Sequence, residues 1–223
     1  MIAVRARGFY TQPMHLAVEG CIGAGKTTIA RALAGSRNAF LLEENFESNP
    51  FIRAFYEDPA KYVVEAEFGF LLIHYHQLLC ASVKPDQDLV SDFLFEKDLI
   101  YADLNFPDSP EKKLFQDLHR ALTARLRRPD LVIFLSAPDE LISERIKRRQ
   151  RDYEQAIDFG YYRRLNAAYE MFFQGYNGAP VLTVQVGKCD FLKDSSLAGM
   201  LSQAADDAVR EQKSTGSFPP KQF

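Results

Sequence analysis

Short apolar runs alternate with stretches of helical periodicity along most of this chain. The apolar runs predict five β-strands, at Leu16–Glu19, Phe40–Glu43, Leu89–Asp92, Leu131–Ser136 and Val181–Val186. The other periodic stretches predict helices at Lys26–Ala34, Pro59–Ser82, Lys97–Asn105, Pro110–Arg127, Glu140–Arg151, Asp158–Gly175 and Asp194–Gln212. This alternation is typical of an α/β protein, in which helices cover both faces of a parallel sheet. We therefore expect a five-stranded parallel sheet with ligands at the carboxyl ends of its strands.

The first predicted strand leads into a glycine-rich segment, the phosphate loop, which a predicted helix follows. Its sequence, Gly20-Cys21-Ile22-Gly23-Ala24-Gly25-Lys26-Thr27, matches the pattern GxxxxGK[ST] in the strand–loop–helix setting that the pattern requires. Glycines let several backbone N–H groups point at one anion, and the helix N-terminus adds its positive dipole. A plain glycine turn would explain the glycines but not the Lys-Thr pair. The predicted ATP-binding residues here are Gly20, Gly23, Ala24, Gly25, Lys26, Thr27 and Thr28.

Two side chains of the phosphate loop have specific expected roles. Lys26 can reach the β- and γ-phosphates of a nucleotide, and the Thr27 hydroxyl can bind Mg²⁺. The expected fold is therefore that of the P-loop NTPases, with ATP and Mg²⁺ as ligands.

Composition limits the remaining possibilities. The chain has 223 residues, of which 47% are hydrophobic and 26% charged, as expected for one globular domain. A net charge of −3 argues against a general nucleic-acid binder. Three cysteines without metal-ligand spacing indicate thiols in a reducing compartment, which favours the cytoplasm. Because there is no apolar run of about 18 residues, no membrane-spanning helix is expected.

Domain boundaries follow from the ends of the periodic region. Residues 1–13 are expected to form a leading tail, and residues 14–211 the folded domain. Residues 212–223 contain Gly216, Ser217, Pro219 and Pro220, a composition that predicts a disordered tail.

A basic segment distinguishes among the classes of phosphate-binding protein. GTPases would need Asn-Lys-x-Asp and Asp-x-x-Gly motifs, which the sequence does not contain convincingly, and large ATPases are normally longer. A small-molecule kinase instead needs an arginine-rich lid. The basic run Glu144–Asp152 indicates such a lid, expected here at about 145–155. Arg145 and Arg149 are four residues apart and share one helix face. A solvated helix with basic residues at its end is the alternative interpretation.

These motifs together resemble the deoxyribonucleoside kinase family, in particular its bacterial deoxyadenosine/deoxyguanosine-type members. The likeness spans roughly residues 14 to 210 and includes the phosphate loop, Asn49–Phe51, Phe55–Pro59, Phe70–Leu72, Phe95–Ala102 and the basic lid. It implies transfer of the γ-phosphoryl group of ATP to the 5′-hydroxyl of a deoxynucleoside in nucleotide salvage. A purine substrate and a homodimer are further expectations from this overall likeness.

The resemblance also implies roles for particular residues. Glu44 matches the general base, with Glu43 as the alternative, because only one of two successive side chains can face the phosphate loop. Tyr56 and Glu154 match the pair that binds the sugar 3′-hydroxyl. The lid residues Arg145, Arg149 and Arg151 match arginines that hold the donor phosphates, and Asp190 matches a contact to the adenine of the donor.

Two positions depart from the family pattern. Where many members carry a glutamine and an arginine seven residues apart, this chain has Glu67 and His74, which indicates altered base selection. A Glu–His contact on a helix surface is the alternative. Asp92, a candidate Mg²⁺ ligand, is followed by Phe93 instead of an arginine, so whichever phosphate contact that arginine makes must come from elsewhere or be missing. Lys97 and Asp98 are candidates for lining the base pocket.

Two other functions remain open from the sequence. A nucleoside monophosphate kinase of the thymidylate-kinase type would share the fold, but it needs a basic site for the acceptor phosphate, for which Arg53 is the nearby candidate. A non-catalytic nucleotide-binding protein would be consistent with the missing arginine.

Overall fold

The computed structural model describes residues 12–149, 158–188, 190–212 and 215–218. The strands are β1 (His15–Gly20), β2 (Phe40–Leu42), β3 (Leu89–Ser91), β4 (Leu131–Ser136), β5 (Val181–Gln185) and β6 (Thr215–Phe218). The described α-helices are α1 (Lys26–Arg37), α2 (Ile52–Glu57), α3 (Pro59–Leu79), α4 (Lys97–Asn105), α5 (Pro110–Thr123), α6 (Asp139–Arg149), α8 (Phe159–Gly175) and α9 (Ser196–Glu211). Single 3₁₀ turns occur at Phe46–Ser48 and Val186–Lys188.

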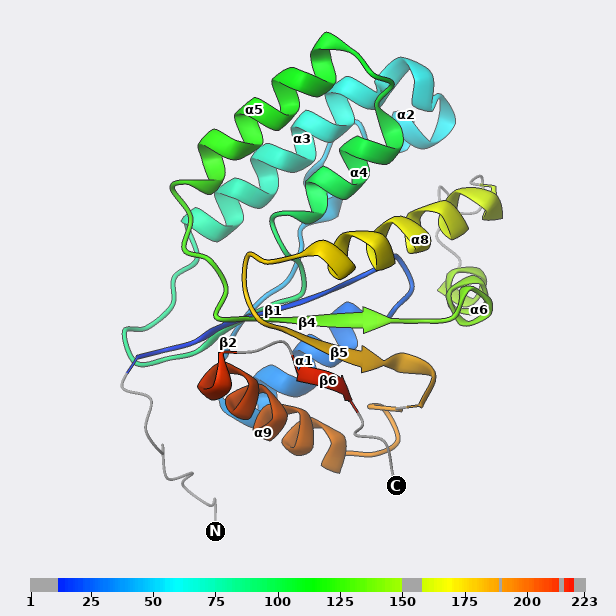
Figure 1. The fold of residues 1–223 in the computed structure, drawn as a ribbon. Helices are drawn as coiled ribbons and strands as arrows, with labels where there is room; N and C mark the ends of the chain where they lie inside the picture. Colours follow the sequence, from blue (N-terminus) through cyan, green and yellow to red (C-terminus); the bar gives the residue numbers. More distant parts are fainter. Residues whose placement is uncertain (1–11, 150–157, 189, 213–214, 219–223) are drawn as a thin grey trace.

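All five predicted strands are present, in one parallel sheet with the order β2-β3-β1-β4-β5-β6. Helices α1 and α9 cover one face, and α3, α4, α5 and α8 lie on the other (Figure 1). Every residue of β1 is buried, as are the first five of β4. These two central strands are covered on both faces, which explains why they are continuous apolar runs in the sequence.

The sixth strand corrects the prediction of a tail. Thr215–Phe218 pairs in parallel with β5 within the segment that was expected to be disordered. The glycine and proline content of this segment indicated a loop. Its aromatic residue, Phe218, instead anchors the segment to the sheet. Phe218 is only 3% exposed and belongs to the main hydrophobic core, so burial of this side chain holds the strand at the sheet edge.

Two capping patterns explain where the helices α3 and α5 begin. The Asp58 side chain accepts a hydrogen bond from the backbone N–H of Lys61, and Pro59 is the first residue of α3. The Ser109 hydroxyl accepts in the same way from Lys112, and Pro110 begins α5. Both helices therefore begin where the sequence predicted, because a polar cap followed by proline is favourable at an N-terminus.

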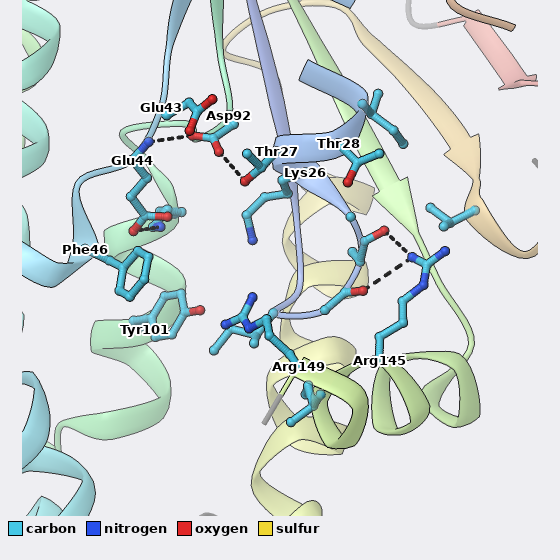
Figure 2. Close-up of a pocket in the computed structure, with 18 of the residues that line it drawn as sticks. Lys26, Thr27, Thr28, Glu43, Glu44, Phe46, Asp92, Tyr101, Arg145 and Arg149 are labelled. Carbon is cyan, nitrogen blue, oxygen red and sulfur yellow. Dashed lines mark hydrogen bonds and ion pairs between the residues drawn. The ribbon is translucent and has the colours of Figure 1, made fainter. Parts of the chain in front are cut away.

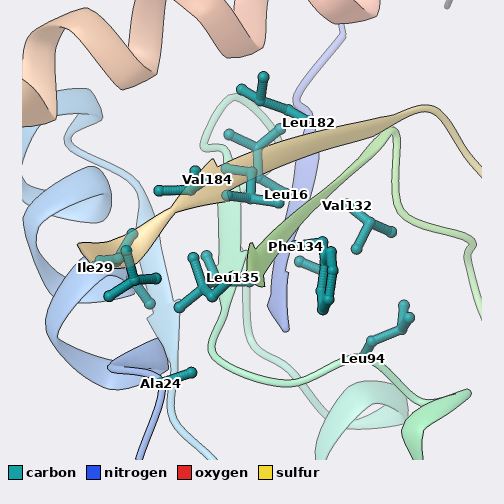
Figure 3. Close-up of a cluster of buried hydrophobic side chains, with 14 of the residues drawn as sticks. Leu16, Ala24, Ile29, Leu94, Val132, Phe134, Leu135, Leu182 and Val184 are labelled. Atoms are coloured by element: carbon teal, nitrogen blue, oxygen red, sulfur yellow. The ribbon is translucent and has the colours of Figure 1, made fainter. Parts of the chain in front are cut away.

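The main core lies between the sheet and its helices (Figure 3). It includes Leu16 of β1, Ile29 of α1, Leu135 of β4 and Val184 of β5, all at most 3% exposed. A second cluster, centred on Phe115, fills the space among α3, α4 and α5. Together these cores fix α3, α4 and α5 relative to the carboxyl ends of the strands.

The position of the phosphate loop depends on a close approach of two strands. Gly20 ends β1 and pairs with Leu135 of β4. A Cβ atom at Gly20 would lie 2.8 Å from the Leu135 carbonyl oxygen, which is closer than carbon and oxygen can pack. Gly25, which caps α1, has a φ of +104°, a conformation that favours glycine. Among the described residues, no helix is long and apolar enough to span a membrane.

Candidate active site

A cavity of about 640 Å³ lies at the carboxyl ends of the strands (Figure 2). The phosphate loop and α6 form one side of it, and residues that follow β2 and β3 face them. Helices α3 and α4 and the start of α8 complete the wall. The cavity thus lies where the parallel sheet was expected to bind a ligand.

Lys26 lies at the N-terminus of α1 and contacts the phosphate loop itself. Its ammonium group donates to the carbonyl oxygen of Gly20 at 2.7 Å and to that of Cys21 at 3.4 Å. The same nitrogen is 3.8 Å from a carboxylate oxygen of Glu19. The Lys26 side chain therefore lies against the phosphate loop and lines the cavity.

The predicted lid helix contacts the phosphate loop directly. Arg145, on α6, donates to the carbonyl oxygens of Ala24 at 2.7 Å and Gly23 at 3.4 Å (Figure 2). Arg149, one turn later, lines the cavity. The alternative of a purely solvated basic helix is therefore wrong for Arg145. Arg151 and Glu154 lie outside the described residues.

Thr27 and Asp92, the two candidate Mg²⁺ ligands, lie side by side. The Thr27 hydroxyl donates to Asp92 Oδ2 at 2.5 Å, and Asp92 Oδ1 accepts from the backbone N–H of Glu44 at 2.6 Å. A hydroxyl and a carboxylate are hard oxygen ligands of the kind Mg²⁺ prefers. The remaining ligands of such an ion would be phosphate oxygens and water.

The structure separates the two neighbouring glutamates after β2. Glu43 lies at the exposed rim of the cavity, with a side chain that is 38% exposed, and its carboxylate accepts two hydrogen bonds from Arg31 at 2.6 and 2.7 Å. The side chain of Glu44 is only 16% exposed and lies across the cavity from Lys26 (Figure 2). Of the two, Glu44 is therefore the carboxylate that faces the phosphate loop.

Glu44 is one end of a buried chain of charged groups. Its Oε1 atom accepts from the Lys97 ammonium at 2.5 Å and lies 3.0 Å from His74 Nε2. The other nitrogen of His74, Nδ1, is 2.8 Å from Asp98 Oδ1. Within the wall of the cavity, Glu44 therefore contacts both Lys97 and His74, and His74 also contacts Asp98.

These contacts explain large shifts in pKa. Burial disfavours the charged form of Glu44, but Lys97 and His74 outweigh it and keep the pKa of Glu44 well below its usual range. Burial likewise opposes the charge of His74, but Asp98 and Glu44 raise its pKa to about 9. Burial opposes the charge of Lys97 too, and Glu44, Glu19 and Asp98 nevertheless raise its pKa. These directions keep Glu44 ionised and His74 and Lys97 protonated at neutral pH.

Glu67 and His74 both face the cavity, as two helical turns predict. They are 3% and 0% exposed, so the interpretation as a surface contact is wrong. The two side chains have different partners. His74 contacts Glu44 and Asp98, whereas Glu67 Oε1 accepts a hydrogen bond from Asn105 at 2.6 Å. Burial raises the pKa of Glu67 to about 8, although the hydrogen bond from Asn105 opposes this. Phe70, between them on α3, stacks on His74 with ring centroids 5.6 Å apart.

The other predicted contacts also line the cavity. Tyr56, on α2, is part of its wall near Ile52 and Phe55. Asp190 lies at the donor side, and its carboxylate forms an exposed ion pair with Lys193 at 3.1 Å. The structure thus brings together the predicted site residues that it describes, except that Gly20 and the alternative candidate Arg53 are not among the residues that line the cavity.

Sequence reasoning missed Glu19, the last side chain of β1 before the phosphate loop. It is fully buried and accepts from the backbone N–H groups of Gly20 and Leu94, both at 2.8 Å, and from the Tyr169 hydroxyl at 3.2 Å. Burial raises its pKa despite the nearby lysines. In the sequence, Glu19 is an acidic residue at the end of an apolar run. A strand that ends in solvent would show the same pattern.

Comparison with known proteins decides the family. The sequence profile of the deoxynucleoside kinase family matches residues 16–210. The chain belongs to the deoxynucleoside kinase family. It is 31% identical over 189 residues to the deoxyguanosine kinase of Bacillus subtilis, covering 81% of this chain and 90% of that protein. It is also 31% identical over 192 residues to the deoxyadenosine kinase of Dictyostelium discoideum, covering 84% and 77%.

The fold of this deoxynucleoside kinase is also known from solved structures. The deoxyadenosine kinase of M. mycoides with bound dCTP superposes with a TM-score of 0.74 over 86% of this chain and all of that chain, at 24% identity. The expected family, fold and ATP-dependent phosphotransferase activity are thereby confirmed, and they are favoured over a thymidylate-kinase-like enzyme.

Proposed function

We propose that this deoxynucleoside kinase transfers the γ-phosphoryl group of Mg·ATP to the 5′-hydroxyl of a purine deoxynucleoside. The observation that carries the proposal is the buried Glu44 carboxylate, which faces the phosphate loop across one cavity. The preference for purines is supported by relatives that are named deoxyguanosine and deoxyadenosine kinases.

The proposed reaction is an in-line transfer between two bound substrates. The 5′-oxygen of the nucleoside forms a bond to the γ-phosphorus, its proton passes to the Glu44 carboxylate, and the bond from the γ-phosphorus to the bridging oxygen breaks. ADP leaves with the electron pair of that bond. Most of the rate enhancement of such a transfer comes from positioning and charge stabilisation.

Donor groups have their proposed positions at the phosphate-loop side. Lys26 and the backbone of the loop would bind the β- and γ-phosphates, and Arg149 would contact them from α6. Thr27 and Asp92 would hold Mg²⁺, which neutralises charge that develops on the phosphates. Arg151 and Asp190 are proposed donor contacts as well.

Acceptor groups lie at the opposite side of the cavity. We assign the sugar 3′-hydroxyl to Tyr56 together with Glu154. The base would lie toward Glu67, where Phe70 offers an aromatic face next to a buried carboxyl group. Nucleobases bind well to such a combination of stacking and edge hydrogen bonds.

The decisive experiment pairs a substrate panel with two neighbouring variants. Purified enzyme with Mg·ATP is offered four deoxynucleosides and their 5′-monophosphates. Deoxynucleosides should be phosphorylated, whereas turnover of monophosphates alone would favour the thymidylate-kinase type. Glu44→Gln should lower kcat by roughly 10²–10⁴-fold with little change in nucleoside binding. The matched control is Glu43→Gln, which should retain near-normal kcat; the reverse ranking would contradict the assignment of Glu44.

We also propose a cytoplasmic homodimer. Support comes from exposed leucines on the adjacent helices α3 and α5, namely Leu72, Leu79 and Leu114, which are 51%, 48% and 61% exposed. Sedimentation equilibrium of the purified protein tests this, and a monomer at micromolar concentration would contradict it.

A further inference from the structure

The position after Asp92 has no cation and cannot provide one. Phe93 occupies it and is fully buried, with its ring centroid 5.1 Å from that of His74. A larger charged side chain could not replace this contact without disturbing the wall of the cavity. Any positive charge on the acceptor side of the site must therefore come from another element.

Lys97 places such a charge next to Glu44. It begins α4, its side chain is only 6% exposed, and its ammonium is 2.5 Å from Glu44 Oε1. The same nitrogen lies 5.8 Å from the centre of the Tyr101 ring, and both residues line the cavity. An ammonium has three donors, so one can bind Glu44 while another contacts a substrate oxygen.

Other nearby cations are committed elsewhere in the described structure. Lys26 binds backbone carbonyl groups of the phosphate loop, and Arg145 binds that loop from α6. Arg148 and Arg149 line the cavity from α6, and Arg31 pairs with Glu43 at the rim of the cavity. His74 also lines the cavity and bridges Glu44 and Asp98. Lys97 is thus the lysine or arginine side chain that contacts the proposed general base within the described residues.

We propose that Lys97 supplies the cation beside the reacting 5′-oxygen, where it holds the Glu44 carboxylate and stabilises negative charge on the transferring phosphoryl group. This inference rests on the proposed function. Lys97 keeps its proton throughout, because the proton of the 5′-hydroxyl passes to Glu44. A buried, pre-positioned cation is most effective in such a water-poor site, since little reorganisation is needed as charge develops.

The primary test uses Lys97→Gln, which can still donate a hydrogen bond to Glu44 but carries no charge. We expect kcat to fall by about 10²-fold or more, with KM for both substrates changed by less than about threefold. Lys97→Arg restores the charge, so its kcat should be at least about tenfold higher than that of Lys97→Gln. The matched control is Lys112→Gln, which breaks an ion pair with Asp103 outside the cavity and should leave kcat unchanged.

Different outcomes separate this inference from the proposed function. A wild-type enzyme that phosphorylates no deoxynucleoside contradicts the proposed function itself. An active wild type together with a folded Lys97→Gln variant within about fivefold of its kcat overturns the role of Lys97, because a hydrogen bond without charge then suffices.

A second variant covers the case in which Lys97→Gln does not fold. Glu44→Gln with Lys97→Gln removes both charges of the pair, which is far less destabilising than removing one. Compared with Glu44→Gln alone, the double variant should lose at least a further tenfold in kcat. Equal rates would overturn the proposal, because Lys97 would then add no stabilisation of the phosphoryl group.

Discussion

The imidazole of His74 makes the stability of this protein depend on pH in a predictable direction. Its pKa is raised from the ordinary value of 6.5 to about 9, because Asp98 and Glu44 outweigh the effect of burial. A group with a raised pKa contributes its full stabilisation below the unfolded pKa and loses it as pH rises through the folded pKa. The difference between the two pKa values corresponds to roughly 3 kcal/mol.

The perturbation is His74→Gln, which keeps polarity at this position but cannot be protonated. Removing the cation between two buried carboxylates should destabilise the protein near pH 6, by about 3–5 kcal/mol. The difference in unfolding free energy between wild type and variant should then shrink by roughly 3 kcal/mol toward about pH 9.5. The titration of Glu67 is present in both proteins and largely cancels in this difference.

Urea unfolding followed by circular dichroism at several pH values measures the effect. The matched control is His76→Gln, two residues further along α3, where the side chain is exposed. Its difference from wild type should be small. If the difference for His74→Gln is as large near pH 9.5 as near pH 6, His74 is not a cation in the folded protein, and the charge assignment of the cluster is wrong.

Two further predictions concern the close strand contact and the base. Gly20→Ala places a Cβ atom 2.8 Å from the Leu135 carbonyl oxygen, so it should destabilise by about 1–3 kcal/mol or more in thermal unfolding. The control Gly35→Ala has nothing within 4 Å and should be neutral or slightly stabilising. Glu67, with a pKa of about 8, is a donor when protonated but only an acceptor when ionised. The wild-type ratio of kcat/KM for deoxyguanosine over deoxyadenosine should therefore rise between about pH 7 and 9. Glu67→Gln should abolish this rise, whereas exposed Glu65→Gln should not; a rise that persists in Glu67→Gln excludes Glu67 as its source.

Local rules predicted most of the sheet and the donor half of the site. A glycine-rich pattern between strand and helix determines its own geometry, so Lys26 and Thr27 could be placed from the sequence. Sequence patterns could not place β6, because one buried aromatic side chain holds a segment whose composition favours a loop. Burial over long sequence separations, as for Phe218, is not visible in local periodicity.

The acceptor half depended on contacts between distant segments. Glu43 and Glu44 are equivalent by position, and what distinguishes them is a pair of hydrogen bonds from Arg31 on another element. No motif in the sequence connects Lys97 to Glu44. The two residues are 53 positions apart in the chain, yet the Lys97 ammonium lies 2.5 Å from Glu44 Oε1. Residues that act through tertiary contacts of this kind are identified only once the helices are packed.

Charge pairing explains how a chain with a net charge of −3 can bind a polyanion. Near the phosphate loop, Lys26 lies 3.8 Å from buried Glu19. On the acceptor side, Lys97 and His74 contact Glu44, and His74 also contacts Asp98. The acids of the acceptor side are therefore neutralised before substrate arrives. In the proposed function, ATP would then be neutralised by groups that are not needed there, namely the loop backbone, Lys26, the α6 arginines and Mg²⁺. Net charge is consequently a poor guide to this function, because the fold pairs its acids locally.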